Sequence, residues 1–295
     1  MKRAVLLNRR SGTAHEETAI RDALGRAGLE ADILTVPSAM GGGSVDPLAG
    51  DYDVLIAAGG DGTVSTVAAA AARAGKTFGV IPCGTLNHFA RDTGIPLELD
   101  AAVSVLAAGH TRLLDTGVVN DRIFINNASI GAYPRMVWER SRARERGLPK
   151  PLALTLAVAR TWLDLRSMTA RLLVDGKELV RRTPFIFVGN SEYELTGTEI
   201  GRRQTMTDGT LSLYMAPRFG RADALLLPLH VILRTLERHE RFEAMQAAAI
   251  TIDTPRARVS AALDGELHVF QAPLTFGVRR DSLRTILPRV ERAGT

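Results

Sequence analysis

The feature that most constrains the fold is an apolar run that breaks into glycines. Residues 54–66 read Val-Leu-Ile-Ala-Ala-Gly-Gly-Asp-Gly-Thr-Val-Ser-Thr. The apolar part does not alternate with polar residues, which is typical of a parallel strand covered on both faces. Gly59, Gly60 and Gly62 let backbone amides approach a ligand, and a helix is predicted to begin near Thr63. This pattern predicts an anion site, although the same turn also joins strand to helix in α/β proteins without a ligand there.

Asp61, inside this turn, indicates how a phosphate would be held. No lysine follows the glycines, and the turn matches neither G-x-x-x-x-G-K-S/T nor G-x-G-x-x-G. A carboxylate placed against a polyphosphate repels it unless a Mg²⁺ ion lies between them. Phosphate charge would therefore be met by amides, by a cation near Asp61, or by basic residues from elsewhere in the chain.

The first 111 residues alternate between strands and helices. Strands are expected at 4–7, 30–36, 54–57 and 77–81, helices at 13–27 and 64–74, and a loop at 37–50. This order predicts an α/β fold with a doubly wound parallel sheet, whose ligand cleft lies at the carboxyl ends of the strands. Three turns should share that edge, at residues 8–12, 59–63 and 82–91.

The chain beyond residue 111 predicts a second, largely antiparallel β domain. Two β segments flank Asp175-Gly176, which is a strong hairpin signal. Two helical insertions are expected, at about 135–165 and 221–248. The expected strands are 171–174, 178–181, 185–188, 211–215, 250–253, 259–263 and 274–278.

Composition limits the partners. The net charge of +5 suggests anionic partners, while aromatic residues make up only 5% and do not interleave with basic ones, which argues against nucleic acid. The single cysteine, Cys83, excludes an internal disulfide and a cysteine-based metal site, and we expect it to be a small packing residue.

Membrane contact is expected to be peripheral and the protein cytoplasmic, at the inner face of the membrane. The apolar run before Asn8 is too short for a signal peptide, and the aliphatic cluster at 225–233 is too short for a membrane span. Basic residues beside apolar ones in the first insertion could hold an anionic bilayer, but a solvated helix face has the same composition. These residues are Arg135, Arg140, Arg142, Arg144, Arg146 and Lys150, beside Trp138, Leu148 and Leu152.

Taken in order, the motifs resemble those of the diacylglycerol kinase catalytic-domain family, which includes bacterial lipid kinases and the sphingosine and ceramide kinases. Residues 8–12 are similar to its N-P-x-S-G turn, 59–64 match G-G-D-G-T-V, and 82–91 match P-x-G-T-x-N-x-F-A-R. Asp208-Gly209 and Leu263-Asp264-Gly265-Glu266 match two features of its second domain.

The sequence departs from the family pattern at two positions. Arg9 stands where the family usually has proline, and Thr207 precedes Asp208 where some members carry another acid. These departures concern the rigidity of the first turn and the strength of the metal site.

The resemblance implies a phosphofructokinase-like ATP-binding domain at 1–118, completed by 279–295, and a β-rich lipid-substrate domain at 119–278, with the acceptor in the cleft between them. Glu266 matches the proposed proton acceptor and Asp264 its essential neighbour. A structural Mg²⁺ would be held by Asp208, with backbone oxygens near Thr205 and Thr210. The implied ATP contacts are Asn8, Arg9, Arg10, Ser11, Gly12, Thr35, Gly59, Gly60, Asp61, Gly62, Thr63, Val64, Ser65, Gly84, Thr85 and Asn87.

Several of these positions also have plain structural explanations. Thr35 could simply end a strand, and Thr85 and Asn87 could cap a short helix. Asp208-Gly209 is also an ordinary turn sequence. In an extended strand, Asp264 and Glu266 would share one face, but Asp-Gly is equally a hairpin signal.

The function expected from the resemblance is ATP-dependent transfer of a γ-phosphate to a hydroxyl of diacylglycerol or a related lipid. An NAD kinase is the competing enzyme, because that family also uses G-G-D-G-T, and a nucleotide- or lipid-binding module without catalysis is the non-enzymatic alternative. The sequence leaves open the oligomeric state, including a homodimer. Apolar residues of the second insertion suit an acyl-chain groove, namely Leu225, Leu226, Leu227, Leu229 and Leu233.

Overall fold

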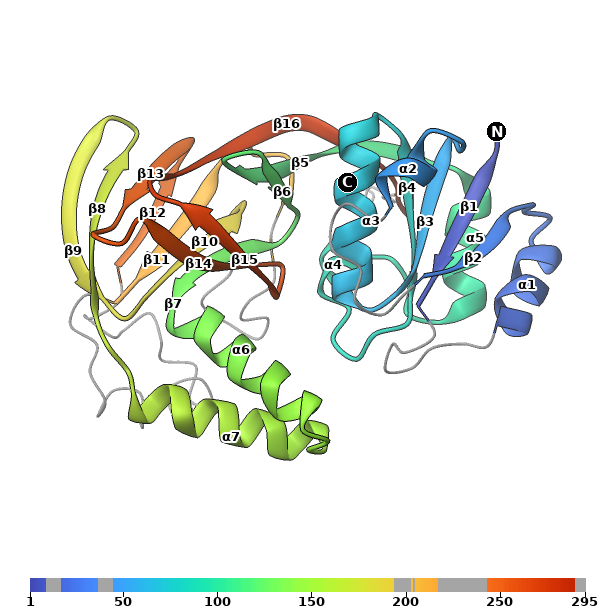
Figure 1. The fold of residues 1–295 in the computed structure, drawn as a ribbon. Helices are drawn as coiled ribbons and strands as arrows, with labels where there is room; N and C mark the ends of the chain where they lie inside the picture. Colours follow the sequence, from blue (N-terminus) through green and yellow to red (C-terminus); the bar gives the residue numbers. More distant parts are fainter. Residues whose placement is uncertain (9–16, 37–44, 194–202, 204, 217–242, 290–295) are drawn as a thin grey trace, which may run out of the picture. The chain divides into compact units, whose positions relative to one another are not determined.

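The computed structural model describes residues 1–8, 17–36, 45–193, 203, 205–216 and 243–289 (Figure 1). The chain divides into two compact units, Met1–Thr116 with Arg280–Thr295, and Gly117–Arg279. Two strands, β5 (Thr111–Val119) and β16 (Leu274–Ile286), each begin in one unit and end in the other.

The first unit is built on the predicted parallel sheet, in the strand order β2-β1-β3-β4. Backbone register aligns Leu7 with Ala58 and Ala58 with Ile81, so the three inner strands end level with one another. The turns that follow them therefore begin at one edge of the sheet. The bounds are β1 Arg3–Leu7, β2 Asp32–Thr35, β3 Val54–Gly59 and β4 Thr77–Pro82.

Helices cover both faces of this sheet (Figure 1). On one face, Ile20, Leu24 and Leu106 from two helices share a core with alternate residues of β1, β3 and β4. Gly79 of β4 makes this packing close, since a Cβ there would lie 2.5 Å from Leu106. On the other face, α3 packs against β3 and β4. The bounds are α1 Glu17–Arg26, α2 Asp46–Ala49, α3 Asp61–Ala74, α4 His88–Thr93 and α5 Leu99–Ala108.

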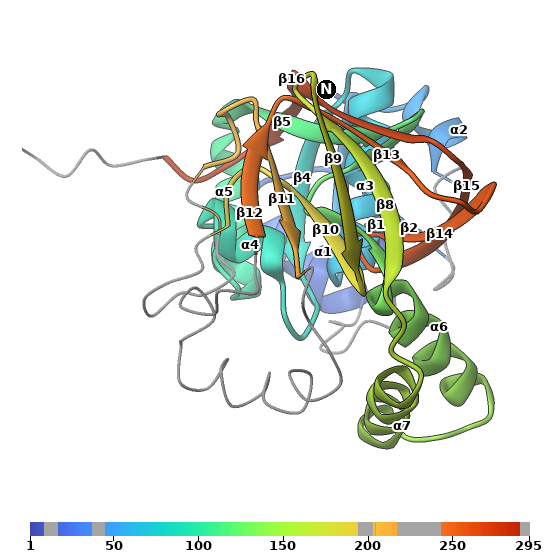
Figure 2. The ribbon, with the colours of Figure 1, turned by 90° about the vertical axis from the view of Figure 1, so that its left-hand side faces the viewer.

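The second unit contains a six-stranded antiparallel sheet in the order β12-β11-β10-β7-β14-β15, and a second set of antiparallel strands, β16-β13-β8-β9 (Figure 2). Their apolar faces share one core, in which Phe124 meets Phe276 edge to face with ring centroids 6.4 Å apart. The bounds are β6 Arg122–Phe124, β7 Asn127–Gly131, β8 Met168–Val174, β9 Lys177–Thr183, β10 Phe185–Asn190, β11 Leu211–Met215, β12 Glu243–Ala247, β13 Ala249–Asp253, β14 Arg258–Leu263 and β15 Glu266–Gln271.

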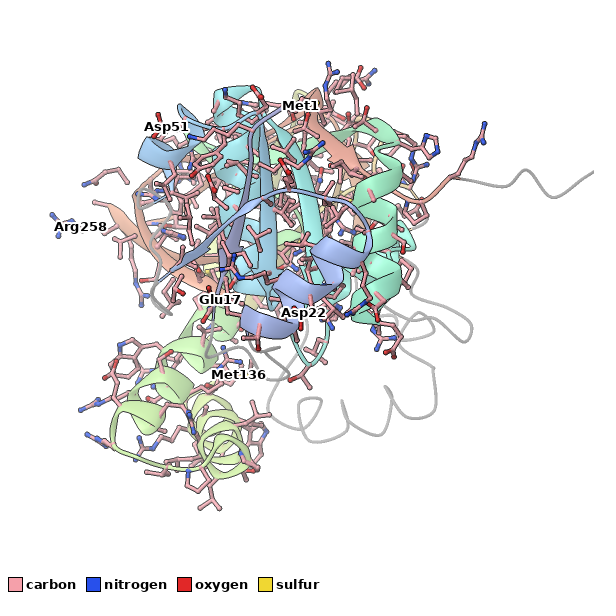
Figure 3. The ribbon with its side chains drawn as sticks, turned by 90° about the vertical axis from the view of Figure 1, so that its right-hand side faces the viewer. Met1, Glu17, Asp22, Asp51, Met136 and Arg258 are labelled. Atoms are coloured by element: carbon pink, nitrogen blue, oxygen red, sulfur yellow. The ribbon has the colours of Figure 1, made fainter. Side chains whose placement is uncertain are left out.

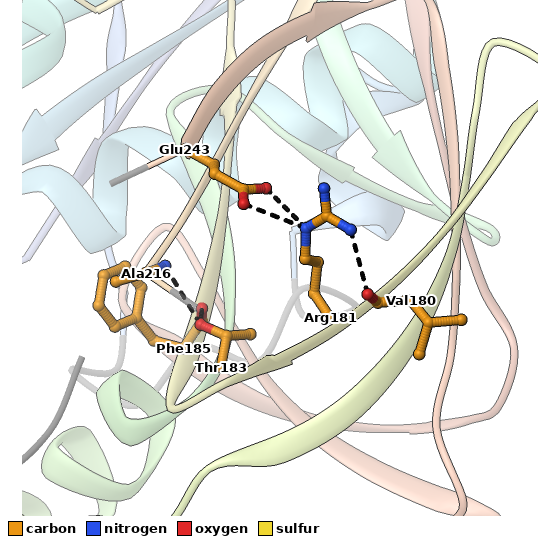
Figure 4. Close-up of polar contacts among 6 residues, drawn as sticks. All are labelled: Val180, Arg181, Thr183, Phe185, Ala216 and Glu243. Atoms are coloured by element: carbon orange, nitrogen blue, oxygen red, sulfur yellow. Dashed lines mark hydrogen bonds and ion pairs between the residues drawn. The ribbon is translucent and has the colours of Figure 1, made fainter. Parts of the chain in front are cut away.

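The end strands β9 and β12 of these two strand sets are joined by an ion pair (Figure 4). Arg181 Nε lies 2.8 Å from a carboxylate oxygen of Glu243. Nearby, the Thr183 hydroxyl donates to Phe185 O at 2.8 Å and accepts from Ala216 N at 3.2 Å. These contacts link the β9–β10 connection to the end of β11.

A helical hairpin, α6 (Ala132–Glu145) and α7 (Lys150–Leu163), interrupts the second unit between β7 and β8. Small buried residues, Ala143, Ala153 and Ala157, allow the two helices to pack closely. Glu139 of α6 is buried and forms an ion pair with Arg160 of α7 at 3.1 Å. None of the described helices is long and apolar enough to cross a bilayer.

The structure differs from the sequence expectations at several elements. Residues 46–49 of the expected loop form α2, and 99–108 form α5, which the pattern did not predict. Residues 243–247 of the expected second helical insertion form β12, because they pair with β11. Residues 13–16 and 217–242, including the predicted helix cap and acyl-groove leucines, lie outside the described residues.

Candidate functional site

The residues that directly follow β1, β3 and β4 meet at the carboxyl ends of these strands. The Asn8 backbone N–H donates to Ala58 O at 3.0 Å, and its side-chain amide donates to the Thr63 hydroxyl at 3.0 Å. The Cys83 N–H donates to Gly59 O at 2.9 Å. Asn8, which follows β1, and Cys83, which follows β4, are therefore both hydrogen-bonded to residues next to the glycine turn after β3, as the parallel sheet predicts.

Glycines in the turns after β3 and β4 contact each other. A Cβ on Gly84 would lie 2.7 Å from Gly60 Cα, and a Cβ on Gly59 would lie 2.6 Å from the Thr63 side chain. Gly60 is extended, with φ −86° and ψ −176°, and it caps α3 without any side-chain hydrogen bond. Gly59, Gly60 and Gly84 thus lie together as a glycine rim beside the first turn of α3, which is an arrangement that lets an anion approach its amides.

Asn87 does not cap α4 with its side chain. Its backbone is left-handed, with φ 51°, and its side-chain amide instead accepts from Gly84 N at 2.8 Å and donates to Gly84 O at 2.9 Å. Asp61 accepts from the His88 N–H at 2.8 Å at the start of α4. The Gly84 N–H already donates to Asn87, so it is not available to bind a phosphate. Gly84 would therefore contribute to a phosphate cradle only by leaving space where another residue would have a side chain.

The remaining nucleotide candidates that the structure describes are two exposed threonines and two buried residues of α3. Thr35 ends β2 and is exposed, and Thr85 is also exposed. Val64 and Ser65 are buried within α3, at 4% and 7% exposure. Residues 9–12, which include Arg9, Arg10, Ser11 and Gly12, lie outside the described residues.

The Asp264-Gly265 pair forms the hairpin turn between β14 and β15, with φ 47° and 86°. The interpretation as an extended strand with Asp264 and Glu266 on one face is therefore wrong. The Asp264 carboxylate accepts three backbone N–H groups, from Ile125 at 2.9 Å, Asn126 at 2.7 Å and Asn127 at 3.0 Å. Asp264 anchors this segment, and Glu266 follows as the half-buried first residue of β15.

Family models match both halves of the chain. Residues 2–119 match the diacylglycerol kinase catalytic domain, and residues 135–287 match the YegS C-terminal NAD kinase beta sandwich-like domain. The chain belongs to the diacylglycerol kinase catalytic-domain family. The glycine turns and the Leu263–Glu266 motif of this diacylglycerol kinase family member lie within the matched ranges, and their individual roles stay predictions.

Named relatives agree with this family. Diacylglycerol kinases of Staphylococcus aureus strains JH9 and Newman are each 31% identical over 163 residues, which is 55% of this chain and 50% of theirs. The chain spans about half the length of the curated relatives it matches. Two Bacillus anthracis structures, of a diacylglycerol kinase and a putative one, share 18% and 20% identity, with TM-scores of 0.69 and 0.74 over 97% of each chain, which shows the fold.

The metal candidate of this diacylglycerol kinase family member is an oxygen-rich turn. Asp208 accepts from the Ser191 hydroxyl at 2.8 Å and from Thr210 N at 3.3 Å, and Gly209 is left-handed. Thr205 bonds the Thr207 hydroxyl at 3.0 Å, while the Thr210 hydroxyl is buried without a partner among the described residues. Oxygen donors of this kind fit Mg²⁺, although the described residues contain no cluster of three or more histidine, cysteine or acidic side chains.

A groove of about 820 Å³ lies in the second unit at the base of the α6–α7 hairpin. Among the described residues that line it, Asp164 is the single acidic one, and the Arg135 guanidinium, then that of Arg166, lower the pKa of its carboxyl. Burial, followed by the charge of Arg122, lowers the pKa of His268. A lower pKa favours the ionised form of Asp164 and the neutral form of His268, so the positive charge of the groove comes from its arginines. These arginines lie among apolar side chains. Its lining includes Arg135, Arg166, Arg256, Arg258, Trp138, Leu267 and Val269.

Proposed function

We propose that this chain is an ATP-dependent lipid kinase that transfers the γ-phosphate of ATP to a hydroxyl group of diacylglycerol or a related lipid. The observation that carries the proposal is the junction of Asn8 with the glycine turns after β3 and β4 at the N-terminus of α3, where Gly60 lies against Gly84. Amides at a helix N-terminus and close backbone approach are what a polyphosphate requires. The family match supports the choice of a lipid as acceptor.

In this proposal the triphosphate lies against the first turn of α3. Gly60 and Gly84 leave room for it, while Asn87 and Asp61 fix the turn after β4 by their bonds to Gly84 and His88. Bound Mg²⁺ would neutralise phosphate charge. Because phosphoryl transfer depends mostly on positioning and on charge neutralisation, a rigid cradle is the main contribution of this unit.

We infer that Glu266 accepts the proton of the lipid hydroxyl. The hydroxyl oxygen forms a bond to the γ-phosphorus, the bond from that phosphorus to the bridging oxygen of ADP breaks, and the proton passes to the Glu266 carboxylate. Asp264 already accepts three backbone N–H groups, so its part is to hold the turn from which β15 begins.

Acceptor choice separates this proposal from its competitors. Purified protein is given Mg-ATP with either dispersed diacylglycerol or NAD, and product is measured for each. We expect phosphorylation of the lipid alone. Phosphorylation of NAD would make the chain an NAD kinase. This is the specific alternative because the domain family matched by residues 135–287 is described as NAD kinase beta sandwich-like. Binding of ATP with no product from either acceptor would indicate a module without catalysis.

We also propose that the α6–α7 hairpin rests on an anionic bilayer, at the inner face of the cell membrane. Helix α7 buries a narrow stripe of small residues and exposes Leu152 by 60% and Leu163 by 62%. On α6, the Arg142 guanidinium lies 5.0 Å from the centre of the exposed Trp138 ring. Side chains project from all around the hairpin near Met136 (Figure 3). Exposed apolar residues beside arginines are typical of peripheral membrane helices.

The oligomeric state is a separate question, and a homodimer stays a prediction.

Replacing Leu152 and Leu163 together by asparagine is expected to weaken binding to phosphatidylglycerol-containing vesicles by about 10- to 100-fold. Both side chains are exposed, so the free energy of unfolding should hardly change. Vesicle co-sedimentation measures the effect, and Val180→Asn, at 61% exposure on β9, is the matched control. Equal sedimentation of the double variant and the control would contradict the proposal.

A further inference from the structure

The segment Ile125–Asn127, which joins β6 to β7 and ends on the first residue of β7, is hydrogen-bonded on both sides. Its three N–H groups donate to Asp264. The Ile125 carbonyl accepts from Arg203 at 2.6 Å and from the Asn190 side chain at 3.1 Å. The Asn126 carbonyl accepts from Asn190 N at 2.8 Å and from the Tyr193 hydroxyl at 2.9 Å. These bonds hold the chain at the point where β6 ends and β7 begins.

Arg203 is the unusual member of this group, because its side chain is buried at 3% exposure. One guanidinium nitrogen donates to Ile125 O, a second donates to Asn126 Oδ1 at 2.7 Å, and the group lies 5.7 Å from the centre of the Tyr193 ring. These short bonds are charge-assisted, and their two donors are held in the fixed fork of a planar guanidinium. A surface arginine requires no such set of partners.

Arg203 and Asp264 act on the same peptide group. The Ile125 carbonyl and the Asn126 N–H belong to one planar unit, and they bond Arg203 at 2.6 Å and Asp264 at 2.7 Å. The cation polarises this peptide in the direction that strengthens its bond to the carboxylate, as in a cooperative hydrogen-bond chain. This chain of bonds ends at Asp264, which lies one glycine before Glu266 in the turn from β14 to β15.

We propose that Arg203 is a positioning residue for phosphoryl transfer, acting through the Ile125–Asn126 peptide and Asp264 to orient Glu266. This inference rests on the proposed function. Arg203 contacts the segment that holds the turn, so its replacement should change turnover and leave nucleotide binding to the first unit as it is.

The test compares Arg203→Lys and Tyr193→Phe with Arg181→Lys, a matched exchange at the ion pair of Figure 4. For Arg203→Lys we expect kcat for lipid phosphorylation to fall about 10- to 100-fold, with KM for ATP within about threefold of wild type. Tyr193→Phe removes one bond to Asn126 and should lower kcat by about two- to fivefold. Arg181→Lys should match wild type.

A double variant separates positioning from general loss of structure. When Arg203→Lys is combined with Glu266→Gln, kcat should fall no further than with Glu266→Gln alone, because Arg203 acts through Glu266. Independent losses that multiply, or a rise in KM for ATP with unchanged kcat, would overturn the inference. So would Arg203→Lys activity equal to that of Arg181→Lys. If the wild-type protein phosphorylates no lipid, the proposed function fails, and the inference on Arg203 fails with it. This outcome is distinguishable from failure of the Arg203 inference alone, because it is seen in the wild-type protein before any substitution is made.

Discussion

Lipid phosphorylation by the Glu266→Gln variant is expected to be about 10²- to 10⁴-fold slower than by the wild-type chain, with the fold unchanged. Glutamine keeps the size and hydrogen-bonding capacity of the side chain at the start of β15, but it cannot accept the hydroxyl proton. Turnover of γ-labelled ATP into lipid at saturating substrate measures the loss, and thermal unfolding checks the fold.

Glu243→Gln is the control for this variant. Glu243 begins β12 and forms a partly exposed ion pair with Arg181, so losing its charge should lower the free energy of unfolding by about 1 kcal/mol or less and leave turnover intact. Full activity of Glu266→Gln would remove Glu266 from the mechanism. It would also leave the Leu263–Glu266 turn with a purely structural role.

Gly60→Ala should weaken ATP binding by about tenfold or more, which corresponds to about 1.4 kcal/mol, without unfolding the first unit. The extended backbone at Gly60 is open to any residue, and an added Cβ would meet Gly84 Cα at an ordinary contact distance of 3.4 Å. The same methyl group would stand where phosphate oxygens must approach the amides of α3. Equilibrium binding of Mg-ATP measures the effect.

Two further glycines provide the comparison. Gly25 lies in α1, and a Cβ added there would meet nothing within 4 Å, so Gly25→Ala should bind ATP normally and gain up to about 1 kcal/mol of stability. Gly84→Ala must push two turns apart and should lose both stability and ATP affinity. Wild-type ATP affinity in Gly60→Ala would show that the glycine rim does not hold the phosphates.

The rim after β1, β3 and β4 could be predicted because parallel strands place their carboxyl ends at one edge, and glycines mark where the chain turns. What the pattern could not give is which side chain serves which turn. The sequence makes Asn87 a candidate for a helix cap, yet its backbone is left-handed and its side chain bonds Gly84. The His88 N–H at the start of α4 instead donates to Asp61 of α3. Such pairings depend on tertiary contacts.

Other parts of the chain were harder to predict for physical reasons. Helix α5 has an N-cap without a side-chain hydrogen bond and apolar residues around most of its surface, so no amphipathic period marks it. Arg203 lies between another arginine and a glutamine, which is a sequence typical of a solvated surface. The neighbouring residues therefore do not distinguish a buried arginine from an exposed one. The Asp264-Gly265 pair did carry a turn signal, and the backbone follows it.

The central claim is that this chain moves the γ-phosphate of ATP onto a lipid hydroxyl. Its most direct test incubates the purified protein with Mg-ATP labelled at the γ-phosphate and a total lipid extract, then separates the organic and aqueous phases. We expect label in a phosphorylated lipid of the organic phase, and at least about 100-fold less of it over the same time with Glu266→Gln. Label that stays in ATP, or enters only a water-soluble acceptor, would contradict the claim.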